Sequence, residues 1–184
     1  VLTDEEVKIR GIPTINDVEN MLRILTEVGC KIKRQKDIAV IDSSNAASHE
    51  IPTRLTKELR SSVFMLGSVL TRFHRAKISY PGGCDIGLRP IDLHLKGLQD
   101  LGVKTIICTD ISKDGMLKGP NLAAMAEMAM TVPQMQVIAS GGVKQPSDIT
   151  ALVGLGYENL SGVIIGKALY ENMATLPEFL AAAK

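Results

Sequence analysis

The chain has 184 residues, of which 45% are hydrophobic and 22% are charged, and its formal net charge is +1. This length corresponds to about one domain, with two small domains as the upper limit. The balance of charge argues against the basic face that a nucleic acid or a membrane surface requires, so neither partner is expected. Trp is absent and aromatic residues make up only 3% of the chain, so platforms for stacking bases or sugars are not expected.

The cysteines are few and widely separated, at Cys30, Cys84 and Cys108. Their odd number and spacing predict a reduced, cytoplasmic protein without disulfides or a metal site, and no cofactor is expected. No apolar run is long enough to cross a bilayer, and no secretory leader is expected. The chain begins Val1-Leu2-Thr3 without an initiator Met, which favours a cut inside a larger domain.

The first half alternates short strands with helices. A capping-box-like start at 16–19, followed by apolar residues at helical spacing, predicts a helix that ends at Gly29. Leucines and valines at helical spacing after Pro52 predict one long helix over 52–73. The remaining predicted elements are strands at 7–12 and 76–80, a hairpin of 30–34 with 38–41, and a helix that starts at Pro90.

The second half, beyond residue 102, alternates apolar strands with helices. The predicted strands are 104–108, 136–140 and 162–165. The predicted helices are one capped by Asn121, one over 146–155, and one that starts with a capping box of Thr175 and Glu178. Continuous apolar strands separated by helices predict a parallel sheet that is covered on both faces.

A cysteine loop follows the predicted strand 76–80. Cys84 comes directly after two glycines, which allow backbone amides to approach an anion. Arg89 is close in sequence and suits a carboxylate or phosphate, and nearby cations favour the thiolate. A cysteine in this setting can act as an acid or a nucleophile. A Gly-Gly turn beside an uninvolved cysteine is the alternative, and spacing alone favours that alternative.

Two glycine-rich turns follow predicted strands of the second half. Gly141 and Gly142 follow one strand, and Gly166 and Lys167 follow the next. Such turns at the carboxyl ends of strands form anion sites, and in (βα)₈ barrels the loops after the last two strands hold the common phosphate site. Ordinary turns are the alternative, because a single Gly-Gly pair usually marks no more than a turn.

One long string in the first half is highly specific. Residues 81–94 read PGGCDIGLRPIDLH, and shorter matching strings are DVENML at 17–22, LRSS at 59–62 and HLKGL at 94–98. On these strings, residues 1 to about 98 resemble the bacterial UDP-N-acetylglucosamine enolpyruvyl transferase family. That family transfers an enolpyruvyl group from phosphoenolpyruvate to UDP-N-acetylglucosamine in cell-wall synthesis.

The resemblance to the transferase family implies roles for individual residues. Cys84 would be the acid or the covalent-adduct site on a mobile loop. The other residues implied to touch substrate are Arg60 and Arg89 at anionic groups, and Pro90, Asp92 and His94 near the uridine. The family's Lys-Asn pair, its catalytic Asp and a further essential Arg have no counterpart among these residues. Because one wall of a two-domain cleft cannot supply all of positioning, proton transfer and leaving-group stabilisation, turnover is not expected.

Three strings carry a second resemblance in the remaining residues. They are TDISKDGMLKGPN at 109–121, VIASGGV at 137–143 and GVIIGKALYE at 162–171. From about residue 98 to 184, the chain is similar to the histidine-biosynthesis isomerases that act on phosphoribosylformimino-aminoimidazole carboxamide ribotide. The matched part corresponds to the last three strand–helix units of that (βα)₈ barrel.

The isomerase resemblance implies that Thr109 and Asp114 line the mouth of the site. The residues implied to grip one phosphate are Gly141, Gly142, Gly166 and Lys167. The family isomerises an aminoaldose to an aminoketose by acid–base catalysis, and its two catalytic aspartates lie on the first and fifth strands, which this chain lacks. Three strands cannot close a barrel, so we expect the exposed sheet edge to pair with another strand.

The two resemblances meet near 99–102, inside one amphipathic helix that ends at Gly102. The predicted fold class is α/β. An enolpyruvyl-transferase-like fragment over 1–98 is fused to a barrel fragment with phosphate-binding loops over 99–184, and the two are expected to merge into one α/β domain.

The sequence therefore predicts a recombined, engineered chimera without a complete active site, in which Cys84 and Asp114 are vestigial. Its remaining activity would be binding of phosphate, sulfate or a phosphorylated small molecule, and copies could associate through the exposed sheet edge. One alternative is an enolpyruvyl transferase that uses Cys84 and Arg89. A further alternative is a fragment of the isomerase that needs a complementing partner.

Overall fold

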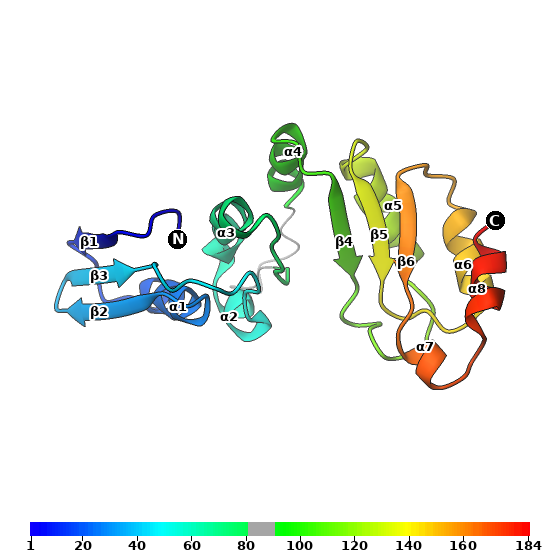
Figure 1. The fold of residues 1–184 in the computed structure, drawn as a ribbon, viewed down its shortest axis with the longest axis horizontal. Helices are drawn as coiled ribbons and strands as arrows, with labels where there is room; N and C mark the ends of the chain where they lie inside the picture. Colours follow the sequence, from blue (N-terminus) through cyan, green and yellow to red (C-terminus); the bar gives the residue numbers. More distant parts are fainter. Residues whose placement is uncertain (81–90) are drawn as a thin grey trace. The chain divides into compact units, whose positions relative to one another are not determined.

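The structure is a computed structural model that describes residues 1–80 and 91–184. Its contacts divide the chain into two compact units, Val1–Leu88 and Arg89–Lys184 (Figure 1). Each unit has its own three-stranded sheet, so the predicted merging of the two segments into one domain is not confirmed. The units divide about ten residues before the predicted segment boundary at residue 98, and that boundary stays a prediction.

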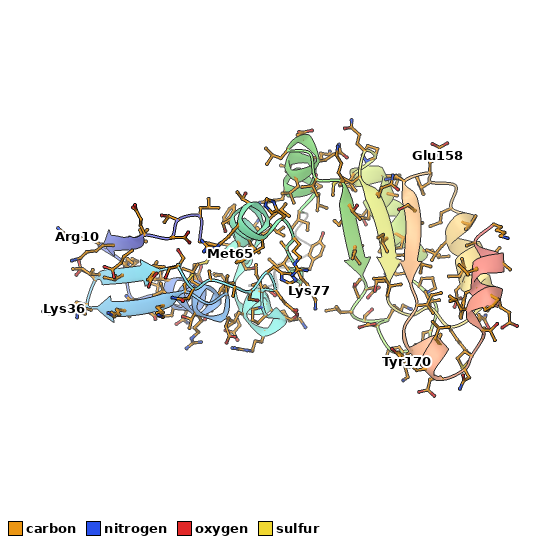
Figure 2. All side chains as sticks on the ribbon, viewed as in Figure 1. Arg10, Lys36, Met65, Lys77, Glu158 and Tyr170 are labelled. Carbon is orange, nitrogen blue, oxygen red and sulfur yellow. The ribbon has the colours of Figure 1, made fainter. Side chains whose placement is uncertain are left out.

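The first unit contains an antiparallel sheet in the order β1-β3-β2. The strands are β1 (Glu6–Arg10), β2 (Lys31–Gln35) and β3 (Ile38–Asp42), so the predicted hairpin is confirmed. Figure 2 shows Arg10 and Lys36 at the end of this sheet where β2 turns into β3. One face of the sheet carries Ile41 into a core that also holds Ile24 of α1 (Asn16–Glu27), and Ala39 on the same strand is buried as well.

The start of α1 differs from the sequence prediction. Ile15 is the N-cap residue, its backbone is extended, and no side chain caps the helix. Glu19, the expected partner in a capping box, instead forms an ion pair with Arg34 of β2. The capping-box prediction is therefore wrong at this helix, because a tertiary ion pair takes the carboxylate that a local cap needs.

The predicted long helix over 52–73 is broken into three pieces. They are α2 (Thr53–Glu58), the 3₁₀ helix η1 (Arg60–Phe64) and α3 (Met65–Phe73). The break falls at Leu59, whose backbone is extended with φ −137° and ψ 114°, while its side chain is 2% exposed. Neither Gly nor Pro stands at this position, so the sequence carries no signal for the break.

The predicted strand at 76–80 is also wrong. Lys77 forms one isolated bridge with Glu50, in which the Lys77 N–H donates to the carbonyl of His49 and the Lys77 carbonyl accepts from Ile51. A strand needs a continuous neighbour for its ladder of hydrogen bonds, and here the pairing ends after one residue. The segment therefore stays irregular.

The second unit contains a parallel sheet in the order β4-β5-β6. Its strands are β4 (Thr105–Thr109), β5 (Gln136–Ser140) and β6 (Leu160–Ile164). Its helices are α4 (Asp92–Asp100), α5 (Leu122–Thr131), α6 (Pro146–Val153), α7 (Lys167–Tyr170) and α8 (Leu176–Ala182). The predicted strand–helix alternation is confirmed, as are the Asn121 cap and the box of Thr175 and Glu178.

Within the second unit, the described helices α5 and α6 pack on one face of the parallel sheet. Cys108, Ala139 and Val163 pack with Met125 of α5 and Leu152 of α6. On the opposite face, Ile107 is 56% exposed and Ile164 is 45% exposed. The prediction that both faces are covered is not confirmed for this face, because an apolar strand indicates only that both of its sides are apolar and not what packs against them.

The edges of the parallel sheet are β4 and β6. Edge strands present backbone groups that a further strand can pair with, so association of copies through an edge stays a prediction. Among the helices of the described residues, none combines the length and the apolar character that a membrane span requires.

The helix α4 packs against the rest of the second unit through its apolar side. Leu95 is 5% exposed and packs with Val132, Met135 and Val137. Ile91 and Val103, which flank α4, pack against the same cluster. The helix that carries the predicted join is therefore part of the core of the second unit.

Replacement of Leu95 by Ala should destabilise the second unit by about 2–5 kcal/mol, because it removes a buried side chain and leaves a cavity. Leu93, on the same helix, is 74% exposed, so Leu93→Ala is the matched control with a loss within about 0.5 kcal/mol. Native-state hydrogen exchange of the β5 amides measures both values. Equal protection in the two variants would show that α4 does not pack as described.

Candidate functional site

The carboxyl ends of the three parallel strands meet at one edge of the sheet. Thr109, Ser140 and Ile164 are the last residues of β4, β5 and β6 and lie side by side in register. The three arrowheads in Figure 1 point to this edge, and α7 lies beyond it. Figure 2 shows Tyr170 of α7 on this side, with Glu158 at the opposite edge. The loops after the strands are thereby brought together.

These loops surround a cavity of about 100 Å³. Its lining comes from all three loops and consists of Asp114, Gly115, Leu117, Ser140, Gly141, Gly142, Val143, Ile164, Gly166 and Lys167. Pockets for drug-sized ligands have roughly 300 Å³ or more, so this cavity suits a small group such as a single anion.

Gly141 and Gly142 are in close contact with neighbouring backbone. Both have positive φ, at 96° and 86°. A Cβ on Gly141 would lie 2.7 Å from the carbonyl oxygen of Asp110, and a Cβ on Gly142 would overlap the carbonyl of Gly119. Glycine is therefore required here for two reasons, the backbone conformation and the lack of space.

The amides of this loop have unused hydrogen-bonding capacity. Gly141 and Gly142 are buried, yet among the hydrogen bonds of the described residues none has the N–H of Gly141, Gly142 or Gly166 as donor. The Gly142 carbonyl, by contrast, accepts from the Gly119 N–H at 2.9 Å. Because buried N–H groups are nearly always paired, unpaired amides that line a cavity indicate a site for an acceptor such as an anion.

Two charged residues of opposite sign line the same cavity. Lys167 follows Gly166 at the start of α7, and Asp114 lies on the loop after β4. Both residues are exposed, so both remain in contact with solvent. A lysine beside free amides favours an anion, whereas the carboxylate favours a ligand that also offers a hydroxyl or amine donor.

The residues predicted from the isomerase resemblance are brought together with one exception. Asp114, Gly141, Gly142, Gly166 and Lys167 all line the cavity, whereas Thr109 ends β4 and is not among the lining residues. Sequence reasoning missed the apolar lining residues Leu117 and Val143, which carry no chemical motif.

The residues predicted from the transferase resemblance lie elsewhere. Arg60 begins η1 in the first unit, while Asp92 and His94 lie in the first turn of α4. Cys84, Arg89 and Pro90 fall outside the described residues. The described transferase-type residues are thus divided between the two units, and their arrangement as one site stays a prediction.

Cys108 precedes Thr109 at the end of β4, but its thiol is not activated as a nucleophile. Burial raises the pKa of this thiol, and the nearby Asp110 carboxylate raises the pKa further. The thiol therefore stays protonated near neutral pH, and the thiolate is the nucleophilic form of cysteine. Cys108 acts as a small apolar residue that packs beneath α5 and α6.

A second hollow, of about 320 Å³, lies beside α1 in the first unit. Arg34 and Arg54, which line it, pair with Glu19 and Glu27 of the same lining. These two guanidinium groups are thus already neutralised by carboxylates. The glycine-lined cavity of the second unit is the better candidate for a functional site.

The comparisons with known proteins point to two families. The family model described as histidine biosynthesis protein matches residues 11–175. This match begins inside the segment that resembles the transferase, so it does not itself mark a join between segments.

Curated relatives come from the other family and are named UDP-N-acetylglucosamine 1-carboxyvinyltransferase. The protein of Buchnera aphidicola (Schizaphis graminum) is 45% identical over 107 residues, which is 58% of this chain and 26% of that protein. The protein of Wigglesworthia glossinidia brevipalpis is 33% identical over 183 residues, which is 100% of this chain and 39% of that protein. The chain thus spans only about a quarter to two fifths of the length of these relatives.

Replacement of Gly142 by Ala should destabilise the second unit more than replacement of Gly102 by Ala. Both glycines have similar positive φ, at 86° and 88°, but a Cβ on Gly102 meets nothing within 4 Å. The comparison therefore isolates the overlap with Gly119, which should add about 1–3 kcal/mol to the cost of the backbone conformation. Urea unfolding measures the difference, and equal losses would contradict the close approach of the two loops.

Proposed function

Since this chain belongs to the histidine biosynthesis protein family, we propose that it binds a phosphate group in the cavity at the carboxyl edge of the parallel sheet. The ligand is inorganic phosphate, sulfate or the phosphate of a small molecule. Binding without turnover is the proposed activity, in a chimera that was assembled by engineering.

The unpaired glycine amides carry this proposal. The N–H groups of Gly141, Gly142 and Gly166 have no acceptor among the described residues, and they line one cavity with Lys167. A phosphate offers several acceptor oxygens at once, so one group can satisfy several amides. The loops after the last two strands of a (βα)₈ barrel are the common phosphate site of that fold, which is an analogy that supports the same assignment.

The groups at the cavity suffice for binding. Among the described residues, the second unit has three parallel strands, fewer than the eight that close a (βα)₈ barrel. Binding of one phosphate needs only the loops described above, whereas either reaction also needs placed acid and base groups around the rest of the substrate.

Titration of inorganic phosphate into the full chain should shift the amide resonances of Gly141, Gly142 and Gly166 along one saturation curve. Lys167→Ala should weaken the affinity by roughly tenfold or more, because a charge-assisted hydrogen bond contributes about 1.5–3 kcal/mol. Lys104→Ala is the matched control, since this exposed lysine precedes β4 at the opposite edge of the sheet. Phosphate that leaves the glycine resonances unchanged, or binds equally well to both variants, would rule out this site.

A second candidate function is enolpyruvyl transfer, and one observation favours it. Relatives from two Buchnera strains, both named for this activity, are 45% and 46% identical to the chain over 107 residues. In this candidate Cys84 would be the acid or adduct residue, with Arg60 and Arg89 at anionic groups. The third candidate is a fragment of the isomerase that needs a complementing partner for activity.

The transferase candidate predicts that phosphate is released from phosphoenolpyruvate when UDP-N-acetylglucosamine is present, and that Cys84→Ala abolishes the release. Our proposal predicts no release above the background of a protein-free reaction. Cys108→Ala is the matched control, because the Cys108 thiol is partly buried and its raised pKa keeps it protonated. Release that depends on Cys84 and not on Cys108 would replace binding by catalysis as the function of this chain.

A further inference from the structure

We propose that Asp110 is a positioning residue for the phosphate cavity, which it shapes without lining it. This inference rests on the proposed phosphate site and adds a residue to it. Asp110 follows the last residue of β4, and its carboxylate and its backbone make separate sets of contacts. Together these contacts connect the loop after β4, the loop after β5 and the start of α5.

The carboxylate of Asp110 connects the loop to the helix that follows it. One oxygen accepts from the Ser112 backbone N–H at 2.9 Å and from the Ser112 hydroxyl at 2.6 Å. The other oxygen accepts from Asn121 Nδ2 at 2.7 Å. The Asn121 side chain also caps α5, since its Oδ1 accepts from the Ala124 N–H at 3.2 Å. The loop that carries Asp114 is thus held at both of its ends.

The backbone of Asp110 fixes the two loops that line the cavity. Its N–H donates to the carbonyl of Ser140 at 3.1 Å, and its own carbonyl accepts from the N–H groups of Lys113 and Asp114 at 3.0 Å. The same carbonyl oxygen lies where a Cβ on Gly141 would approach to 2.7 Å. A displacement of Asp110 would therefore move Asp114 and Gly141, and both line the cavity.

The charged form of Asp110 is the form that these contacts require. Hydrogen bonds from Ser112 and from the Asn121 side chain lower the pKa of this carboxyl group. All three donors point at carboxylate oxygens, so a protonated or amide side chain would place a donor against a donor. The network is therefore specific for a carboxylate at 110 that faces an amide at 121.

This specificity allows a test by exchange of the two side chains. In Asp110→Asn the new amide group would face the Asn121 amide, donor against donor. In Asn121→Asp two carboxylates would face each other. In the double variant D110N/N121D the amide at 110 donates to the carboxylate at 121, which still caps α5 because Asp is as good an N-cap as Asn. The double variant also keeps the net charge of the wild type.

Three quantities are measured in the full chain for each variant: the amide shifts of Gly141, Gly142 and Asp114 without phosphate, the dissociation constant for inorganic phosphate, and the unfolding midpoint. Each single variant should move these resonances and weaken phosphate binding by about tenfold, the effect of roughly one lost hydrogen bond to a charge. The double variant should restore both properties to within about twofold of the wild type. Glu158→Gln removes a carboxylate at the opposite edge of the sheet and should change neither property (Figure 2).

Three results would overturn the positioning role. One is a single variant with a lower unfolding midpoint but unchanged glycine resonances and affinity, which is what a merely structural contact gives. Another is a folded double variant that stays as impaired as the single variants. If the single variants do not fold, Ser112→Ala takes their place, because it removes only the hydroxyl hydrogen bond of an exposed residue. Unchanged glycine and Asp114 resonances in Ser112→Ala would then contradict the proposal. Absence of phosphate binding by the wild type would refute the proposed function alone, because the resonances without phosphate still test the positioning.

Discussion

The arrangement of the site depends on the close packing of three backbone segments. Gly141 and Gly142 form one segment, and Asp110 and Gly119 belong to the other two. The first of these glycines lies against the carbonyl of Asp110 and the second against the carbonyl of Gly119, with no space for a side chain at either position. This contact brings the loop after β4 onto the loop after β5 and leaves two buried N–H groups without an acceptor among the described residues. The unpaired amides of Gly141 and Gly142 face the cavity that this close approach helps to form, and Lys167 lines the same cavity from the loop after β6.

Each unit has a hydrophobic core of its own, which suits two segments that resemble different families. In the first unit, α1, α2 and α3 bury Ile24, Leu55 and Val69 in one apolar cluster. In the second unit, Leu95 of α4 enters the cluster that holds Val137 of β5. A helix needs only a matching apolar side to dock on such a cluster, so α4 can begin in a segment that resembles one family and end in a segment that resembles another. Identity to the transferase relatives is 45% over 107 residues and 33% over 183 residues in two different proteins, which fits a similarity that is concentrated in part of the chain.

Sequence reasoning succeeded where the signal is local. The strand 136–140 has the predicted bounds, and the caps at Asn121 and Thr175 are present because a cap involves residues only three positions apart. The glycine loops were found for the same reason. It failed where distant residues decide, as at Leu59, where the helix breaks without Gly or Pro. The network of Asp110 was also missed, because its partner Asn121 lies 11 residues away, at the far end of a loop whose shape no local rule predicts.

The most direct test of the account is a crystal structure of the full chain grown in the presence of phosphate. The account predicts one phosphate at the carboxyl edge of the β4-β5-β6 sheet, with its oxygens within hydrogen-bond distance of the N–H groups of Gly141, Gly142 and Gly166 and of the Lys167 ammonium group. A structure in which this cavity stays free of phosphate while those N–H groups find acceptors within the protein would contradict it.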